Sequence, residues 1–216
     1  MKNHIVLVGD SIFDNIVYVG ENEAVPDHLR QLLPGKVKST LLAVDGSFSK
    51  EVPDQLKNIP CDTTHIFIST GGNDALAAKS VIDSGYDSVK EIDISGNFTD
   101  LLALLQQAFK NDYRKAITSA IATGKTVTVC TIYDCIPGLE PRHRMALSLF
   151  NDVIITGAVQ NNIPIIDLRI VCNESTDYSE VSIIEPSSQG GRKIAEIIAK
   201  VYRQSLKNNL NTVIFS

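Results

Sequence analysis

The feature that most constrains the fold of this chain is a set of short apolar runs rich in β-branched residues. Each run is apolar at successive positions and does not alternate with polar residues, which predicts strands that are covered on both faces. Such strands are typical of a parallel sheet packed between two layers of helices. The runs are residues 4–8, 38–44, 65–70 and 126–132, with a fifth at 163–168.

Segments with helical spacing lie between these runs. Residues 98–123 carry leucine, alanine and phenylalanine on one side of a helix, and residues 145–160 and 191–207 repeat the pattern. Strands that alternate with helices through right-handed crossovers form an open, doubly wound sheet. We therefore predict a three-layer α/β/α sandwich with about five parallel strands. Residues 83–97 are mixed and polar, and we expect a surface loop there that borders the site.

Length and charge narrow the class of protein further. The chain has 216 residues, of which 44% are hydrophobic, so we expect one domain over residues 1–216. The net charge is −5 and no basic stripe is present, which argues against nucleic acid as a partner. No signal peptide is visible, and no apolar run reaches the roughly 20 residues needed to span a bilayer. We expect a cytoplasmic protein that acts on a small molecule.

In an open α/β sheet, ligands bind beyond the carboxyl ends of the strands. Three loops at such ends are small and polar: GDS at residues 9–11, DGS at 45–47 and GGND at 71–74. Ser11 is well placed there to act as a nucleophile. Backbone N–H groups at glycine turns and an asparagine amide are suitable donors for an oxyanion, and Gly46 and Asn73 supply them.

Each signal has a purely structural interpretation. A serine after a strand is more often a helix cap than a nucleophile, and the GGND segment can be a turn. Asp10 and Asp74 each adjoin a candidate residue, and we interpret them as supporting residues that accept hydrogen bonds from loop amides. The acidic residues are scattered and no phosphate-binding motif follows a strand, so we expect neither a metal nor a cofactor.

Taken together, these loops resemble the conserved blocks of a known family. VGDS at residues 8–11, DGS at 45–47 and STGGND at 69–74 resemble the first three blocks of the SGNH/GDSL hydrolases. Residues 186–195 resemble the segment that opens the last helix of that family. The resemblance implies a flavodoxin-like sandwich that hydrolyses esters, thioesters or acylated sugars. It also implies Ser11 as nucleophile, with the Ser11 N–H, the Gly46 N–H and the Asn73 side chain as oxyanion donors.

The resemblance fails at the last block. The family has D-x-x-H followed by proline, whereas this chain reads SIIEP at residues 182–186, with Glu185 at the histidine position. A serine hydroxyl is a poor nucleophile without a base within hydrogen-bond reach. The identity of that base therefore decides how much activity the resemblance implies.

Three interpretations follow. In the first, Glu185 is the base, because burial beside Ile183 and Ile184 would raise its pKa toward neutrality. In the second, a histidine from elsewhere replaces it, and His143 is the candidate; its structural alternative is a solvated histidine at a helix start. In the third, the chain binds an acyl or carbohydrate ligand without efficient hydrolysis.

Overall fold

A parallel six-stranded sheet with the order β2-β1-β3-β4-β5-β6 forms the centre of the molecule. The computed structural model describes residues 3–33, 35, 37–89, 95–207 and 211–216. The strands are β1 (His4–Gly9), β2 (Lys38–Leu41), β3 (His65–Ser69), β4 (Thr126–Cys130), β5 (Ile165–Ile166) and β6 (Ile214–Phe215). The five predicted runs all contain strands. The sixth strand was not predicted, because two residues are too short to show a periodic pattern.

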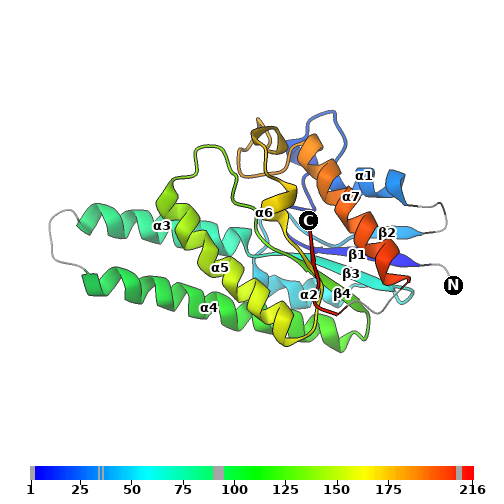
Figure 1. The fold of residues 1–216 in the computed structure, drawn as a ribbon, viewed down its shortest axis with the longest axis horizontal. Helices are drawn as coiled ribbons and strands as arrows, with labels where there is room; N and C mark the ends of the chain where they lie inside the picture. Colours follow the sequence, from blue (N-terminus) through cyan, green and yellow to red (C-terminus); the bar gives the residue numbers. More distant parts are fainter. Residues whose placement is uncertain (1–2, 34, 36, 90–94, 208–210) are drawn as a thin grey trace.

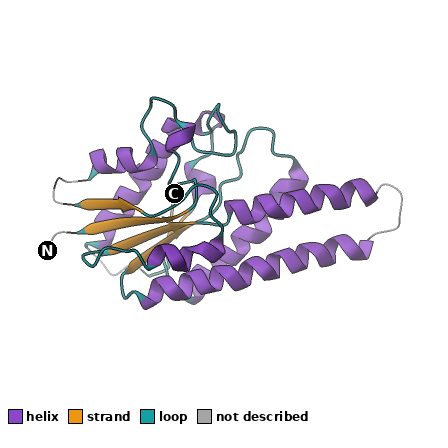
Figure 2. Cartoon of the chain, turned by 180° about the vertical axis from the view of Figure 1, so that it is seen from behind, coloured by secondary structure: helices purple, strands orange, loops and turns teal. Residues whose placement is uncertain are grey.

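Helices cover both faces of this sheet, as Figures 1 and 2 show. They are α1 (Val25–Leu32), α2 (Val52–Leu56), α3 (Gly72–Val89), α4 (Ser95–Ala122), α5 (Pro141–Gln160), α6 (Leu168–Val171) and α7 (Ser188–Ser205). The loops of the described ranges contain the short 3-10 helices η1 (Ile16–Tyr18), η2 (Ser49–Glu51) and η3 (Ser175–Asp177). The predicted three-layer α/β/α fold is therefore confirmed. None of the helices in the described ranges is long and apolar enough to cross a bilayer.

The continuous apolar runs explain the two cores. Along β1, Ile5 and Leu7 join the core that contains residues of α1 and α7, whereas Val6 and Val8 join the core that contains residues of α2, α4 and α5. Successive side chains of a strand point to opposite faces, so a run that is apolar at every position needs cover on both sides. The central strands β1 and β3 are consequently buried along their whole length, whereas the edge strands β2 and β6 are partly exposed.

The structure corrects the prediction of a surface loop at residues 83–97. Helix α3 continues to Val89 and α4 begins at Ser95, so most of this segment is helical, and residues 90–94 lie outside the described residues. Figure 1 shows α3 and α4 side by side, extending together beyond the sheet. Packing between the two helices stabilises a helix through polar residues that carry little helical signal of their own.

The strand order places a crevice at the end of β1. The chain passes from β1 to β2 on one side and later to β3 on the other, which makes this point the topological switch of the sheet. Gly9, the last residue of β1, pairs in register with Ser69, the last residue of β3. The first and third polar loops thus leave the sheet side by side.

Candidate active site

Ser11 follows a sharp turn that only glycine permits. Gly9 has a φ of 130°, and a Cβ added there would lie 1.6 Å from the carbonyl oxygen of Ser69. The next N–H, that of Asp10, donates to the same Ser69 oxygen at 3.1 Å. The chain then turns, and Ser11 lines a cavity of about 310 Å³ while its residue surface is only 5% exposed.

Asn73 reaches the same cavity from the first turn of α3. Its Nδ2 donates a hydrogen bond to the carbonyl oxygen of Ser47 at 2.9 Å, which ties the second polar loop to the third. Gly46 precedes that carbonyl and has a φ of 78°. The structure therefore brings Ser11 and Asn73 to one cavity, and it places Gly46 next to a residue bonded to Asn73. Gly46 itself is exposed and is not among the described residues that line the cavity.

Glu185 lies on the wall of this cavity and is 6% exposed. Burial raises the pKa of its carboxyl to about 7, while a hydrogen bond with the Ser11 side chain lowers that pKa and the charge of Asp45 raises it. No described residue gives its Oε2 a hydrogen-bond partner. A carboxyl group with a pKa near neutrality therefore lines the same cavity as the candidate nucleophile Ser11.

The segment that carries Glu185 is held from three sides. The N–H of Ser179 donates to the Glu185 carbonyl at 2.8 Å, and the Tyr133 hydroxyl donates to the carbonyl of Ile184 at 2.6 Å. Nδ2 of Asn15 donates to the carbonyl of Pro186 at 3.2 Å. These bonds fix the backbone on both sides of Glu185, so the carboxyl group faces Ser11 without a large loss of conformational entropy.

The two supporting aspartates do order their loops. Oδ1 of Asp10 accepts from the N–H of Ile12 at 3.2 Å, and the Asp74 carboxylate accepts from both the N–H and the Oγ of Ser49 at 2.9 Å. Asp10 is also 1% exposed, and burial raises its pKa to about 8. The N–H groups of Ile12 and Gly72 lower that pKa by less than burial raises it. Asp10 is therefore a neutral acid at pH 7.

His143 is not solvated, which corrects the expectation for a histidine at a helix start. It lies in the first turn of α5, is 7% exposed and lines the same cavity as Ser11. Its Nε2 lies 2.6 Å from Oδ1 of Asp83 on α3. The ring is buried because the first turn of α5 packs against α3.

One functional residue carried no sequence signal. Gln55 of α2 donates from Nε2 to the carbonyl of Gly9 at 2.8 Å, and its Oε1 accepts from the Gly9 N–H at 2.8 Å. The same Nε2 lies 3.3 Å from the Ser47 hydroxyl. Gln55 thus joins the first and second loops of the site. A glutamine in a short helix, 46 residues from its partner, shows no pattern that could reveal this contact.

This parallel α/β sandwich is the fold of the G-D-S-L lipolytic proteins. A lipase, Lip_vut3, from a goat rumen metagenome is 18% identical, with a TM-score of 0.68 over 98% of this chain and 100% of the other. A member of the lipolytic protein G-D-S-L family from Veillonella parvula is 17% identical, with a TM-score of 0.67 over 94% and 99%. A catalytic mutant of the acetylxylan esterase Axe2 from Geobacillus stearothermophilus is 12% identical, with a TM-score of 0.66 over 92% of each chain. No protein-family model and no curated protein matches the sequence.

Proposed function

We propose that this protein is a serine hydrolase that cleaves an acyl ester through a covalent acyl-enzyme on Ser11. The observation that carries the proposal is that Ser11, Asn73 and the buried Glu185 carboxyl line one cavity, with the Ser11 side chain near enough to lower the pKa of Glu185. The fold shared with lipases and esterases of known structure supports the same class of reaction. Thioesters and acylated sugars are substrates of the same reaction type.

In the proposed reaction, Oγ of Ser11 attacks the acyl carbon and its proton passes to Glu185. The negative charge that develops on the acyl oxygen is stabilised by the N–H of Ser11 and by the Asn73 amide, since both residues line the cavity. Glu185 then returns the proton to the departing alkoxide, and the alcohol leaves. Water repeats the sequence on the acyl-enzyme and releases the acid. Glu185 suits this role because its pKa of about 7 makes it both a usable base and a usable acid near neutral pH.

A second function is a protein that binds an acyl or carbohydrate ligand without efficient hydrolysis. One observation favours it: one N–H of the Asn73 amide is already engaged by the Ser47 carbonyl, and Gly46 is not among the described residues that line the cavity, so fewer donors face an oxyanion than the hydrolase requires. In that case the cavity next to Ser11 holds the ligand and no acyl-enzyme forms.

Labelling with a fluorophosphonate probe, together with turnover of p-nitrophenyl acetate, distinguishes the two functions. We expect Ser11→Ala to abolish both signals. We expect Glu185→Gln to reduce turnover by roughly 10²–10⁴-fold with the fold intact, because a neutral amide cannot accept the proton. Ser205→Ala is the matched control, since the Ser205 hydroxyl also contacts an ionisable side chain, 2.8 Å from Nε2 of His65, but does not line the cavity.

Labelling that persists in Ser11→Ala contradicts the proposal. Absence of any serine-dependent turnover in the unmodified protein favours the binding function. Loss of turnover in His143→Ala, with Glu185→Gln fully active, assigns the base to His143.

A further inference from the structure

The cavity beside Ser11 extends away from the sheet between α3 and α5. Its wall is largely apolar and includes Ala75, Leu76, Ile132, Leu139, Leu147 and Phe150. Its volume of about 310 Å³ lies at the lower end of the range of about 300–1,000 Å³ for small-molecule sites. An apolar space of this size suits a hydrocarbon chain and not a large polar group.

The length of the cavity follows from the helix that forms one wall. Gly72 and Lys79 both line it, and they are seven residues apart on α3. A rise of about 1.5 Å per residue places them about 10 Å apart along the helix axis. An extended chain advances about 1.2 Å per bond, so this length holds a chain of roughly eight to nine carbon atoms.

The wall at the Lys79 end contains an ion pair. His143 of α5 lines the cavity, and its Nε2 lies 2.6 Å from Oδ1 of Asp83, one turn beyond Lys79 on α3. Nζ of Lys79 lies 2.6 Å from Oδ2 of the same aspartate, and Nη2 of Arg142 lies 3.6 Å from its Oδ1. Asp83 therefore bridges two cationic side chains and the His143 imidazole, and it holds the His143 ring in a fixed position between the two helices.

We propose that the His143–Asp83 pair closes this end of the cavity and sets the longest hydrocarbon chain that the ligand can carry. The inference rests on the proposed function only in taking the ligand to be an ester. The fit of a hydrocarbon chain to the cavity does not depend on that function. A chain longer than the cavity would have to displace the buried imidazole ring and break its hydrogen bond with Asp83. A shorter chain gains affinity with each methylene, because each one moves apolar surface out of water.

Equilibrium binding to the Ser11→Ala variant tests the proposal without any need for turnover. Methyl esters of straight-chain acids with four to twelve carbons, and acetates of alcohols of the same lengths, are titrated calorimetrically. The two series show whether the chain in the cavity belongs to the acyl or to the alcohol part of the ester. We expect affinity to rise about fourfold per methylene up to about eight carbons in one series, and then to stop rising.

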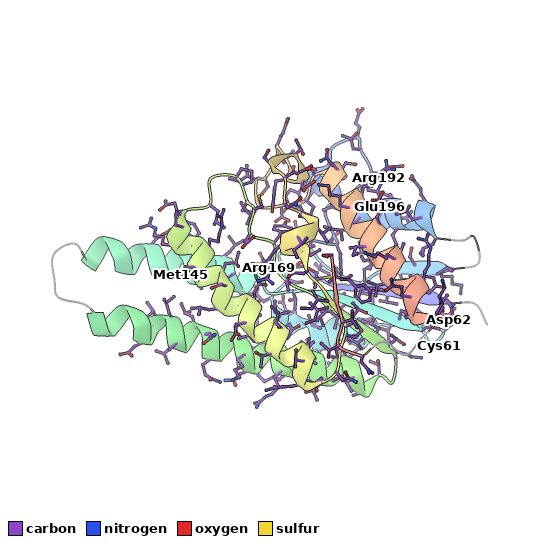
Figure 3. All side chains as sticks on the ribbon, in the orientation of Figure 1. Cys61, Asp62, Met145, Arg169, Arg192 and Glu196 are labelled. Atoms are coloured by element: carbon purple, nitrogen blue, oxygen red, sulfur yellow. The ribbon has the colours of Figure 1, made fainter. Side chains whose placement is uncertain are left out.

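Two changes at His143 move this limit in opposite directions. In the Ser11→Ala background, His143→Ala removes the ring and extends the limit by two or more carbons, and His143→Trp shortens it. His4→Ala is the matched control, because His4 is another buried histidine with an aspartate partner, its Nδ1 lying 2.7 Å from Oδ1 of Asp62. In Figure 3, Asp62 lies at the amino ends of the strands, far from Met145 in the first turns of α5.

A chain-length limit that is the same in His143→Ala, His143→Trp and the parent overturns the proposal, as does an equal shift in His4→Ala. If one variant fails to fold, as judged by circular dichroism, the other still tests the proposal, because the direction in which it should move the chain-length limit is specified. Failure of the proposed function has a different signature, because Ser11-dependent hydrolysis is then absent while the chain-length limit still moves with His143.

Discussion

At the scale of single residues, two buried carboxyl groups on the wall of one cavity give the site its chemistry. Asp10 and Glu185 both line the cavity, and burial is the main cause that raises the pKa of each, to about 8 and about 7. The charge of Glu185 also raises the pKa of Asp10, so the ionisation of one disfavours that of the other. Near pH 7.5 the pair favours an ionised Glu185 beside a neutral Asp10. This is the state that a base for Ser11 requires.

We therefore predict that kcat/KM for p-nitrophenyl acetate rises with pH through a midpoint near 7. The base must be ionised, so activity falls about tenfold per pH unit well below the pKa of Glu185. Rates measured from pH 5 to 9 check this, and Glu185→Gln should leave a small, flat residual rate over the same range. A midpoint that survives unchanged in Glu185→Gln would assign the titration to another group.

At the scale of secondary structure, short helices position the loops of the site. Helix α2 has only five residues, yet its Gln55 side chain bonds both backbone groups of Gly9, two residues before Ser11. Buried amide groups of this kind are costly to leave without partners. The end of β1 is thus held by its neighbours in the sheet and by a side chain from outside the sheet.

We expect Gln55→Ala to lower the free energy of unfolding by about 1–3 kcal/mol, because it leaves the buried Gly9 N–H without its acceptor. Urea titration of the variant measures this loss. Turnover should fall as well, since the turn that presents Ser11 loses a restraint. Gln204→Ala is the control, because Gln204 is exposed near the end of α7, and its unfolding free energy should match that of the parent. Equal stability of the two variants would show that the Gln55 contacts are weak.

At the scale of the whole molecule, the same buried acid makes folding depend on pH. The pKa of Asp10 rises from its ordinary value of 3.8 to about 8 in the folded chain. Between these values the folded state retains a proton that the unfolded state releases. Stability therefore falls as the pH rises from about 4 to 8, which is the reverse of the usual behaviour of an ion-paired carboxylate.

Asp10→Asn should remove this dependence. We predict that the unfolding free energy of the variant, relative to the parent, increases between pH 4 and 8 by up to several kcal/mol, as judged from urea titrations at each pH. Asp83→Asn is a control, because the contribution of Asp83 to the unfolding free energy should change with pH in the opposite direction. Hydrogen bonds from Lys79 and His143 lower the pKa of Asp83 to about 2, so its contribution is present above pH 4 and is lost as the pH falls toward 2. A difference between Asp10→Asn and the parent that does not change with pH would contradict the prediction.

The amino-acid sequence by itself determined the sheet and the composition of the three polar loops. The runs at residues 5–8 and 66–68 are apolar at every position, and this property is local and visible without coordinates. Gly9, Ser11 and Asn73 follow directly from the positions where such strands end. The helix over residues 83–89 was not predicted, because its stability depends on packing against α4. Strand β6 was not predicted, because it has only two residues.

Only the tertiary structure decided which side chains share the cavity. His143 meets Asp83 across 60 residues and Gln55 meets Gly9 across 46, and no periodicity along the chain encodes such pairs. The pKa of Glu185 belongs to the same class of property, since it depends on how much water and which neighbours surround the carboxyl group. A residue type is a property of one position, whereas burial and partnership arise only when distant segments pack together.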